Sequence, residues 1–174
     1  AYVMVGGKHQ FFPKRELGTI EYSIEATYQG LYQELRGYLG RTRKGYPVEP
    51  IPGELSYARY ALYHFVAKDK QRREPYASLH RAGLNLRGLV RVLLFKRFES
   101  SVYAFRETIK RLLTVHERFA RALAQGIVPA GDKAEDILYE PNQAEEQDFM
   151  DALRQASGRY DAADFDIDRL RRHI

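Results

Sequence analysis

The residues with the clearest chemical potential are basic side chains in the middle of the chain. Residues 80–123 carry ten Lys and Arg against three Glu. At the four-residue spacing of a helix face, Glu107 can pair with Arg111 and Glu117 with Arg121. Apart from these pairs and from Arg81 at the start of the segment, seven candidate cations remain: Arg87, Arg91, Lys96, Arg97, Arg106, Lys110 and Arg118. Such cations can bind the phosphates of a nucleic-acid backbone, and a solvated helix face is the alternative.

Motifs for catalysis or metal binding are incomplete. A phosphate loop requires G-x-x-x-x-G-K-[ST], but in "VGGKH", residues 5–9, His9 replaces the Ser or Thr and Tyr2 the first Gly. The five histidines form no H-x-x-x-H pair and there is no cysteine, which disfavours a zinc site. "DFDID", residues 164–168, lacks the glycine and distal Glu of a calcium loop and favours an acidic helix start. No G-x-S-x-G nucleophile motif occurs. We therefore expect no cofactor in this chain and do not expect the chain alone to be an enzyme.

Two long helices are expected to position the basic residues. Residues 77–99 carry apolar side chains almost all round the helix, which is typical of a central, buried helix. Residues 101–125 form a second helix, closed by Gly126 and Pro129. Its apolar seam follows a seven-residue repeat: Val102, Phe105, Ile109, Leu112, His116, Phe119 and Leu123. His116 on this seam is expected to be a core histidine rather than a catalytic one.

The stretch "KRFESS", residues 96–101, lies where the two helices meet. Lys96 and Arg97 would occupy the last turn of the first helix, where cations offset the helix dipole. Ser100 or Ser101 is placed to cap the second helix. We interpret the stretch as the corner of an antiparallel helical hairpin, which can also present two cations from a rigid base.

The remaining elements follow from the spacing of apolar residues. In chain order they are a strand at 19–24, an amphipathic helix at 25–39, a Pro/Gly loop at 41–53, a second amphipathic helix at 54–70, and weak helices near 143–156 and from Asp164. The sequence thus predicts a mainly α fold, a helical bundle built on a long antiparallel helical hairpin. A short N-terminal β-strand precedes it and an acidic C-terminal appendage follows. The predicted division is 1–129 for the helical module and 130–174 for the appendage.

Composition indicates a globular chain, with 174 residues of which 44% are apolar and 29% charged. No apolar run approaches the ~18 residues of a membrane helix, so no membrane partner is expected. The N-terminus lacks the basic region of a signal peptide and the chain lacks cysteine. A cytoplasmic location is the default expectation.

Charge is unevenly distributed along the chain. The net charge is +5, yet residues 132–168 carry twelve Asp and Glu against three Lys and Arg. The basic middle therefore has either a polyanion partner or the acidic end as a docking surface. The start at Ala1 and the helical pattern at the C-terminus suggest an excised fragment.

Three stretches together resemble one family, the SWI/SNF-type helicase ATPases. "FPKRELGTIEYSIEATYQGLYQEL", residues 12–35, resembles the segment that leaves the first RecA-like lobe, including its Leu31-Tyr32 pair. "LRGLVRVLLFKRFESSVYAFRETIKRLL", residues 86–113, resembles the Lys-Arg-x-Glu-Ser-Ser hairpin of large bacterial members. "YDAADFDIDRLRRHI", residues 160–174, resembles the acidic stretch that leads towards the second lobe.

The resemblance implies that this chain is the helical segment between the two motor lobes of such an ATPase and that it does not contain the motor lobes themselves. Walker A, Walker B and the arginine motif of the second lobe have no counterparts in this chain. ATP and Mg are therefore implied for the parent protein, and DNA and the parent's own motor lobes are the implied partners. A helical protein-interaction module, with a basic docking face and no role in nucleic-acid binding, is the alternative function.

Overall fold

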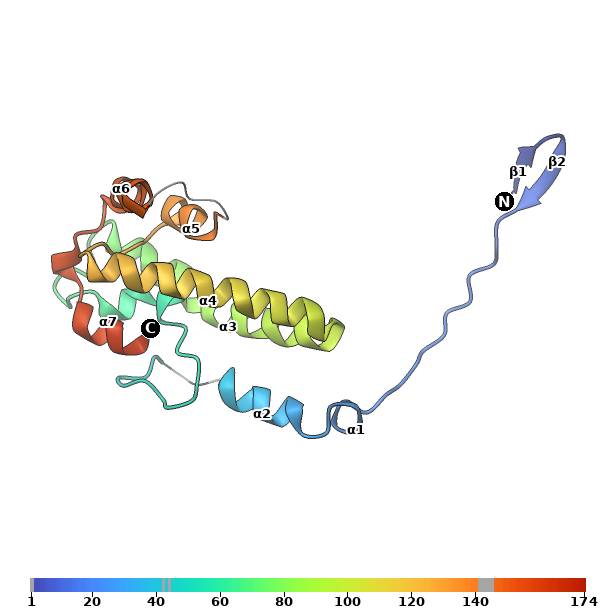
Figure 1. The fold of residues 1–174 in the computed structure, drawn as a ribbon, viewed down its shortest axis with the longest axis horizontal. Coiled ribbons are helices and arrows are strands. Elements are labelled where there is room, and N and C mark those ends of the chain that lie inside the picture. Colours follow the sequence, from blue (N-terminus) through green and yellow to red (C-terminus); the bar gives the residue numbers. More distant parts are fainter. Residues whose placement is uncertain (1, 42, 44, 141–145) are drawn as a thin grey trace. The chain divides into compact units, whose positions relative to one another are not determined.

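The computed structural model describes residues 2–41, 43, 45–140 and 146–174, except for the side chains of residues 81, 82, 84 and 85. It divides into two compact units, Ala1–Leu35 and Arg36–Ile174. The chain is mainly helical, with a two-stranded antiparallel sheet near the N-terminus (Figure 1). This confirms the predicted mainly α fold class. None of the described helices is both long enough and apolar enough to cross a membrane.

The N-terminal unit begins with a β-hairpin. Strand β1 (Tyr2–Val5) pairs antiparallel with β2 (Lys8–Phe11). The turn consists of Gly6 and Gly7, with φ of 56° and 76°. Two-residue hairpin turns need such left-handed values, which glycine adopts without strain. The sequence that resembles an incomplete phosphate loop is therefore a hairpin turn.

The strand predicted at residues 19–24 is wrong. Residues 12–23 form neither helix nor strand, and Ile20 and Tyr22 are exposed. Helix α1 (Ile24–Tyr28) begins where the strand was expected to end, because Ser23 caps it by accepting a hydrogen bond from the Ala26 N–H at 3.2 Å. Alternating apolar residues form a strand only beside a partner strand, and no described segment pairs with residues 19–23.

The single helix predicted at residues 25–39 is divided into two. Gln29 and Gly30 adopt left-handed φ values of 47° and 86°, which end α1 and separate it from α2 (Leu31–Tyr38). The boundary between the two units falls within α2.

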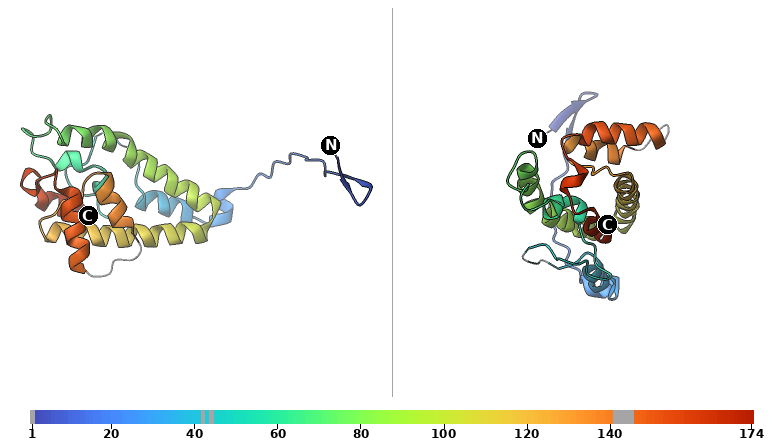
Figure 2. Two further views of the ribbon diagram at one scale, coloured as in Figure 1. Left: turned by 90° about the horizontal axis from the view of Figure 1, so that it is seen from above. Right: turned by 90° about the vertical axis from the view of Figure 1, so that its left-hand side faces the viewer.

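The predicted helical hairpin is confirmed. Helices α3 (Tyr76–Ser100) and α4 (Val102–Ala124) run in opposite directions, meet at the corner that joins them, and diverge away from it (Figures 1 and 2). Ser101 forms the corner, and its Oγ accepts a hydrogen bond from the Ala104 N–H at 3.2 Å. The rings of Phe98 and Phe105 meet edge to face across the hairpin, with centres 5.4 Å apart.

The predicted seam of α4 is only partly buried. Phe105, Phe119 and Leu123 are buried, whereas Val102 is exposed. Val115 takes the buried position next to the half-buried His116.

The prediction that α3 is the buried central helix is wrong. Leu94 and Phe98 are buried, but Leu86, Leu89 and Leu93 are 36%, 52% and 53% exposed. Helix α4 and two short 3-10 helices, η1 (Ala58–Tyr60) and η2 (Leu62–Phe65), pack against α3. They cover only part of its circumference. A helix with apolar residues all round must then expose some of them.

The helix predicted at residues 54–70 is also wrong, since η1 and η2 take its place. Beyond them the backbone is extended and meets the C-terminal segment. Val66 forms an antiparallel bridge with Phe165, and the Ala67 N–H donates to the Asp164 carbonyl at 2.8 Å. Pairing with this distant segment replaces the hydrogen bonds of a continuing helix.

The C-terminal segment, expected as an acidic appendage, contributes to the same core as the hairpin. It contains α5 (Asp132–Tyr139), α6 (Glu146–Ser157), η3 (Ala162–Asp164) and α7 (Ile167–His173). Its buried apolar side chains include Ala134, Leu138, Phe149, Met150, Leu153, Phe165 and Leu170. They form one cluster with residues of η2 and α4. Helices α6 and α7 match the two weak helices predicted here, while residues 143–145 of that prediction lie outside the described residues.

Candidate nucleic-acid interface

Arg118, one of the seven candidate cations, is half-buried and hydrogen-bonds to the backbone of the fold. Its Nη1 donates to the carbonyl oxygens of Leu138 at 2.8 Å and Glu140 at 2.6 Å, and its guanidinium lies 5.6 Å from the Phe149 ring centre. The last carbonyls of a helix need donors from outside it. Arg118 thus caps α5 and is separate from the exposed basic surface.

Arg87 and Arg91 lie one turn apart on α3 and anchor the loop that follows α2. Arg87 Nη2 donates to the Gly45 carbonyl at 2.8 Å, and its guanidinium lies 5.5 Å from the Tyr46 ring centre. Arg91 Nη1 donates to the Gly40 carbonyl at 3.1 Å. Both arginines therefore have a structural role in this loop.

The remaining candidates lie at or near the hairpin end, which we define as residues 96–106. Lys96, Arg97 and Arg106 are exposed there. Arg97 Nε donates to Thr108 Oγ1 at 3.3 Å. Lys96 and Arg106 make no hydrogen bond or ion pair with any residue that the structure describes. Their charge is therefore available to a partner.

Lys110, the seventh candidate, has an acidic neighbour. Its Nζ lies 2.7 Å from Glu107 Oε1, and the hydrogen bond from Lys110 lowers the pKa of Glu107. Glu107 thus pairs with Lys110 where the sequence suggested Arg111. Arg121, expected to pair with Glu117, lies 3.7 Å from Glu146 of α6.

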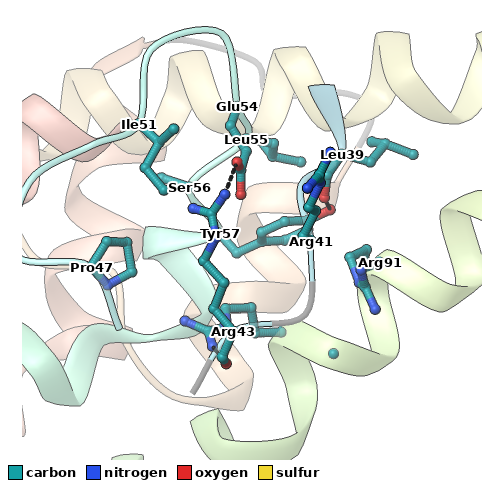
Figure 3. A pocket seen from close by; sticks show the side chains of 12 residues that line it. Leu39, Arg41, Arg43, Pro47, Ile51, Glu54, Leu55, Ser56, Tyr57 and Arg91 are labelled. Carbon is teal, nitrogen blue, oxygen red and sulfur yellow. Dashed lines mark hydrogen bonds and ion pairs between the residues drawn. The ribbon is translucent and has the colours of Figure 1, made fainter. Parts of the chain in front are cut away.

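A second basic feature is a pocket of about 200 Å³ between α3 and residues 39–57 (Figure 3). Four arginines line it: Arg41, Arg43, Arg87 and Arg91. We call it the arginine pocket. Glu54 is the one carboxylate among the described residues that line it, and it accepts a hydrogen bond from Arg43 Nη2 at 2.9 Å. The lining carries a clear excess of positive charge.

Backbone geometry shapes this pocket at two positions. Gly40 has φ of 77°, and a Cβ at this position would lie 2.4 Å from Glu54 Oε1. Tyr57 has a left-handed φ of 56°, which costs a residue other than glycine about 1–3 kcal/mol. The buried Tyr57 hydroxyl donates to the Leu39 carbonyl at 2.8 Å, and burial raises the pKa of Tyr57, so it is a neutral donor.

Arg41 and Arg43 line this pocket but were not among the candidate cations predicted from the sequence. The run "RTRKG" at residues 41–45 signals their charge, but its position in a Pro/Gly loop gives no spatial relation to α3. Conversely, two of the aspartates near residue 164 take structural roles. Asp164 accepts a hydrogen bond from Tyr76 Oη at 2.6 Å, and Asp166 caps α7. Within the described ranges, no group of His, Asp and Glu is placed to hold a metal ion.

The hairpin also exposes apolar side chains. Leu86, Leu89 and Leu93 recur along one stripe of α3, and Val102 and Tyr103 lie at the hairpin end. Tyr103 is 76% exposed. The chain therefore presents cations and apolar groups on the same long hairpin.

Comparisons with protein-family models, curated proteins and solved structures find no match to this chain.

Proposed function

We propose that this chain is the helical segment between the two motor lobes of a SWI/SNF-type ATPase, and that its hairpin end contacts the DNA backbone. The proposed family is based on the resemblance of the "KRFESS" stretch, and the helix corner that these residues form is consistent with that resemblance. ATP and Mg would bind to the motor lobes of the parent protein. This chain would transmit lobe movement and add a backbone contact.

The proposed contact with the DNA backbone is supported by the exposure of three cations at the hairpin end. Lys96, Arg97 and Arg106 are exposed and lie within about five residues of the corner at Ser101, whereas Arg87, Arg91 and Arg118 hydrogen-bond to carbonyls of the protein. Exposed cations at one end of the hairpin can approach phosphates without breaking the fold.

Such a contact would be weak and independent of sequence. Each phosphate that is neutralised releases condensed counterions, so the logarithm of affinity falls with the logarithm of salt concentration by about 0.9 per phosphate. Three cations at the hairpin end can neutralise at most about three phosphates. We expect non-specific affinity in the range of about 10⁻⁴–10⁻⁶ M at physiological salt.

The test is duplex binding by a variant with Lys96→Gln, Arg97→Gln and Arg106→Gln. We expect weaker binding of every duplex sequence and a salt slope lower by about one for each cation that no longer meets a phosphate. The control removes equal charge elsewhere through Lys68→Gln, Lys133→Gln and Arg159→Gln, all at exposed positions. If both variants bind the duplex with equally reduced affinity, net charge explains the binding and the hairpin-end contact is refuted. DNA-stimulated ATPase of the parent protein, carrying the same substitutions, tests the motor assignment.

A protein-interaction module is the second candidate, and the exposed leucines of α3 favour it. Interface cores are depleted in charge and enriched in large apolar side chains. Leu89→Ser with Leu93→Ser should then abolish capture of the partner while duplex binding stays unchanged. Loss of duplex binding by this variant would instead place the leucines within the DNA-binding surface.

A further inference from the structure

We infer that the arginine pocket binds a single phosphate group. The inference does not depend on the proposed function, because the pocket lies apart from the hairpin end and is formed by different residues. It rests on the charge of the lining, the size of the pocket and the hydrogen bonds of the arginines.

The charge of the lining favours a divalent anion. Four guanidinium groups line one small space, and Glu54 is the one acidic side chain in the described lining. Arg87 and Arg91 hydrogen-bond to backbone carbonyls, which help to hold their side chains in place. A phosphate group carries about −1.5 to −2 at pH 7 and offers three acceptor oxygens, which suits several arginines better than one carboxylate does.

The size of the pocket limits the ligand. Sites for drug-sized molecules occupy about 300–1,000 Å³, and this pocket is smaller, at about 200 Å³. A phosphate group and the first atoms of its ester fit such a space, whereas a whole nucleotide would project from it. Arginine is also the side chain whose planar fork matches phosphate oxygens in pairs.

Glu54 regulates access to the site. Its carboxylate accepts a hydrogen bond from Arg43, and its side chain lies directly against Gly40. An incoming phosphate would compete with this carboxylate for Arg43. Removing the Glu54 charge should therefore tighten phosphate binding, which is the opposite of what loss of a structural ion pair alone would do.

Gly88 provides a way to block the pocket without removing charge. It lies on α3 in the pocket wall, and a Cβ built on it meets no other atom within 4 Å. A leucine at this position would occupy the space a ligand needs. It also has higher helix propensity than glycine, so α3 should tolerate it.

The experiment is calorimetric titration of the whole chain with inorganic phosphate. We expect Arg41→Gln with Arg87→Gln, and separately Gly88→Leu, to weaken binding by about tenfold or more, as loss of charge-assisted hydrogen bonds predicts. Glu54→Gln should tighten it, and Lys133→Gln on α5 should leave it unchanged. Circular dichroism checks that each variant is folded. If Gly88→Leu unfolds, the inference is still tested by the other variants, because phosphate binding should weaken in the Arg41/Arg87 variant and tighten in the Glu54 variant.

Two further arms identify the source of the phosphate. Competition by a duplex without terminal phosphates would assign a nucleic-acid backbone, whereas competition by a small phosphate monoester alone would assign a free phosphate ester. Equal phosphate binding by all variants would overturn the inference. Binding of a glutamate-rich peptide without any binding of phosphate would also overturn it and make the pocket a site for acidic protein.

Discussion

The side chain of Arg59 has no exposed surface, and its Nη1 donates to both carboxylate oxygens of Glu135, at 2.6 and 2.7 Å. Its Nη2 reaches the hydroxyls of Tyr60 and Tyr139, the latter at 2.9 Å. Arg59 belongs to η1 and Glu135 to α5. The ion pair therefore ties the segment before the hairpin to the C-terminal segment.

Removing the carboxylate should destabilise the fold. In Glu135→Gln the buried guanidinium loses its counter-charge, and we expect the free energy of unfolding to fall by about 1–3 kcal/mol. The cost should stay below that of a wholly buried pair, since the Glu135 side chain is 41% exposed and water can replace it in part. Urea denaturation measures it. Asp136→Asn, an exposed neighbour on α5, is the control, and equal losses in the two variants would argue against the ion pair.

The two faces of α3 should respond differently to truncation. Phe98 is buried against Phe105, so Phe98→Ala should cost about 3–5 kcal/mol. Leu93 is exposed, so Leu93→Ala should change stability by no more than about 0.5 kcal/mol. Denaturant melts of both variants check this. A loss at Leu93 as large as that at Phe98 would mean that its face is covered in solution.

The hairpin could be predicted from sequence because its signals are local. The repeat from Phe105 to Leu123 sets the face of α4, and Ser101 supplies its cap through a hydrogen bond within three residues. The buried face of α3 could not be predicted, because α3 has apolar residues on nearly all of its faces. Which face is buried depends on where η1 and η2 pack.

Contacts between residues far apart in the sequence explain two failures of prediction. One is the helix expected at residues 54–70, and the other is the assignment of all seven cations to one exposed surface. Phe65 and Val66 meet Phe165 and Asp166, a hundred positions away, and no local pattern encodes that contact. Likewise, Arg87 and Arg118 were candidates because of their charge, but Arg87 donates to a carbonyl in the loop after α2 and Arg118 to carbonyls at the end of α5. The sequence therefore marks which residues are cations but does not distinguish those that bind the protein's own backbone from those that remain exposed.

The free energy of unfolding should fall in mild acid, because His116 takes up a proton more readily in the unfolded chain than in the folded one. It is half-buried on α4 with Nδ1 2.8 Å from the Leu112 carbonyl, and burial lowers its pKa below the ordinary 6.5. Between the lowered pKa and 6.5 the unfolded chain binds the proton and the folded chain does not, so lowering the pH favours unfolding. One proton contributes a slope of at most about 1.4 kcal/mol per pH unit.

Thermal melts between neutral pH and mild acid measure this effect. His116→Gln should flatten the dependence below pH 6.5, whereas His9→Gln, exposed on β2, should not. Burial also lowers the pKa of His64, so His64→Gln with His116→Gln should flatten it further. An unchanged slope in the double variant would show that other groups control the acid sensitivity.

Ser101 allows the structural and electrostatic roles of the hairpin end to be separated. Ser101→Ala removes the cap of α4 and should cost about 1 kcal/mol, or roughly 2–4 °C in Tm for a chain of this size. Because Lys96, Arg97 and Arg106 remain, the salt slope of duplex binding should not change. Ser100→Ala, in the adjacent exposed position, should alter neither property.

Ser101→Asp keeps a capping oxygen and suits the helix dipole, so stability should be retained. Its negative charge beside three cations should nevertheless weaken duplex binding. Wild-type affinity in this folded variant would argue that DNA does not approach the corner, and the hairpin end would then be a structural turn alone.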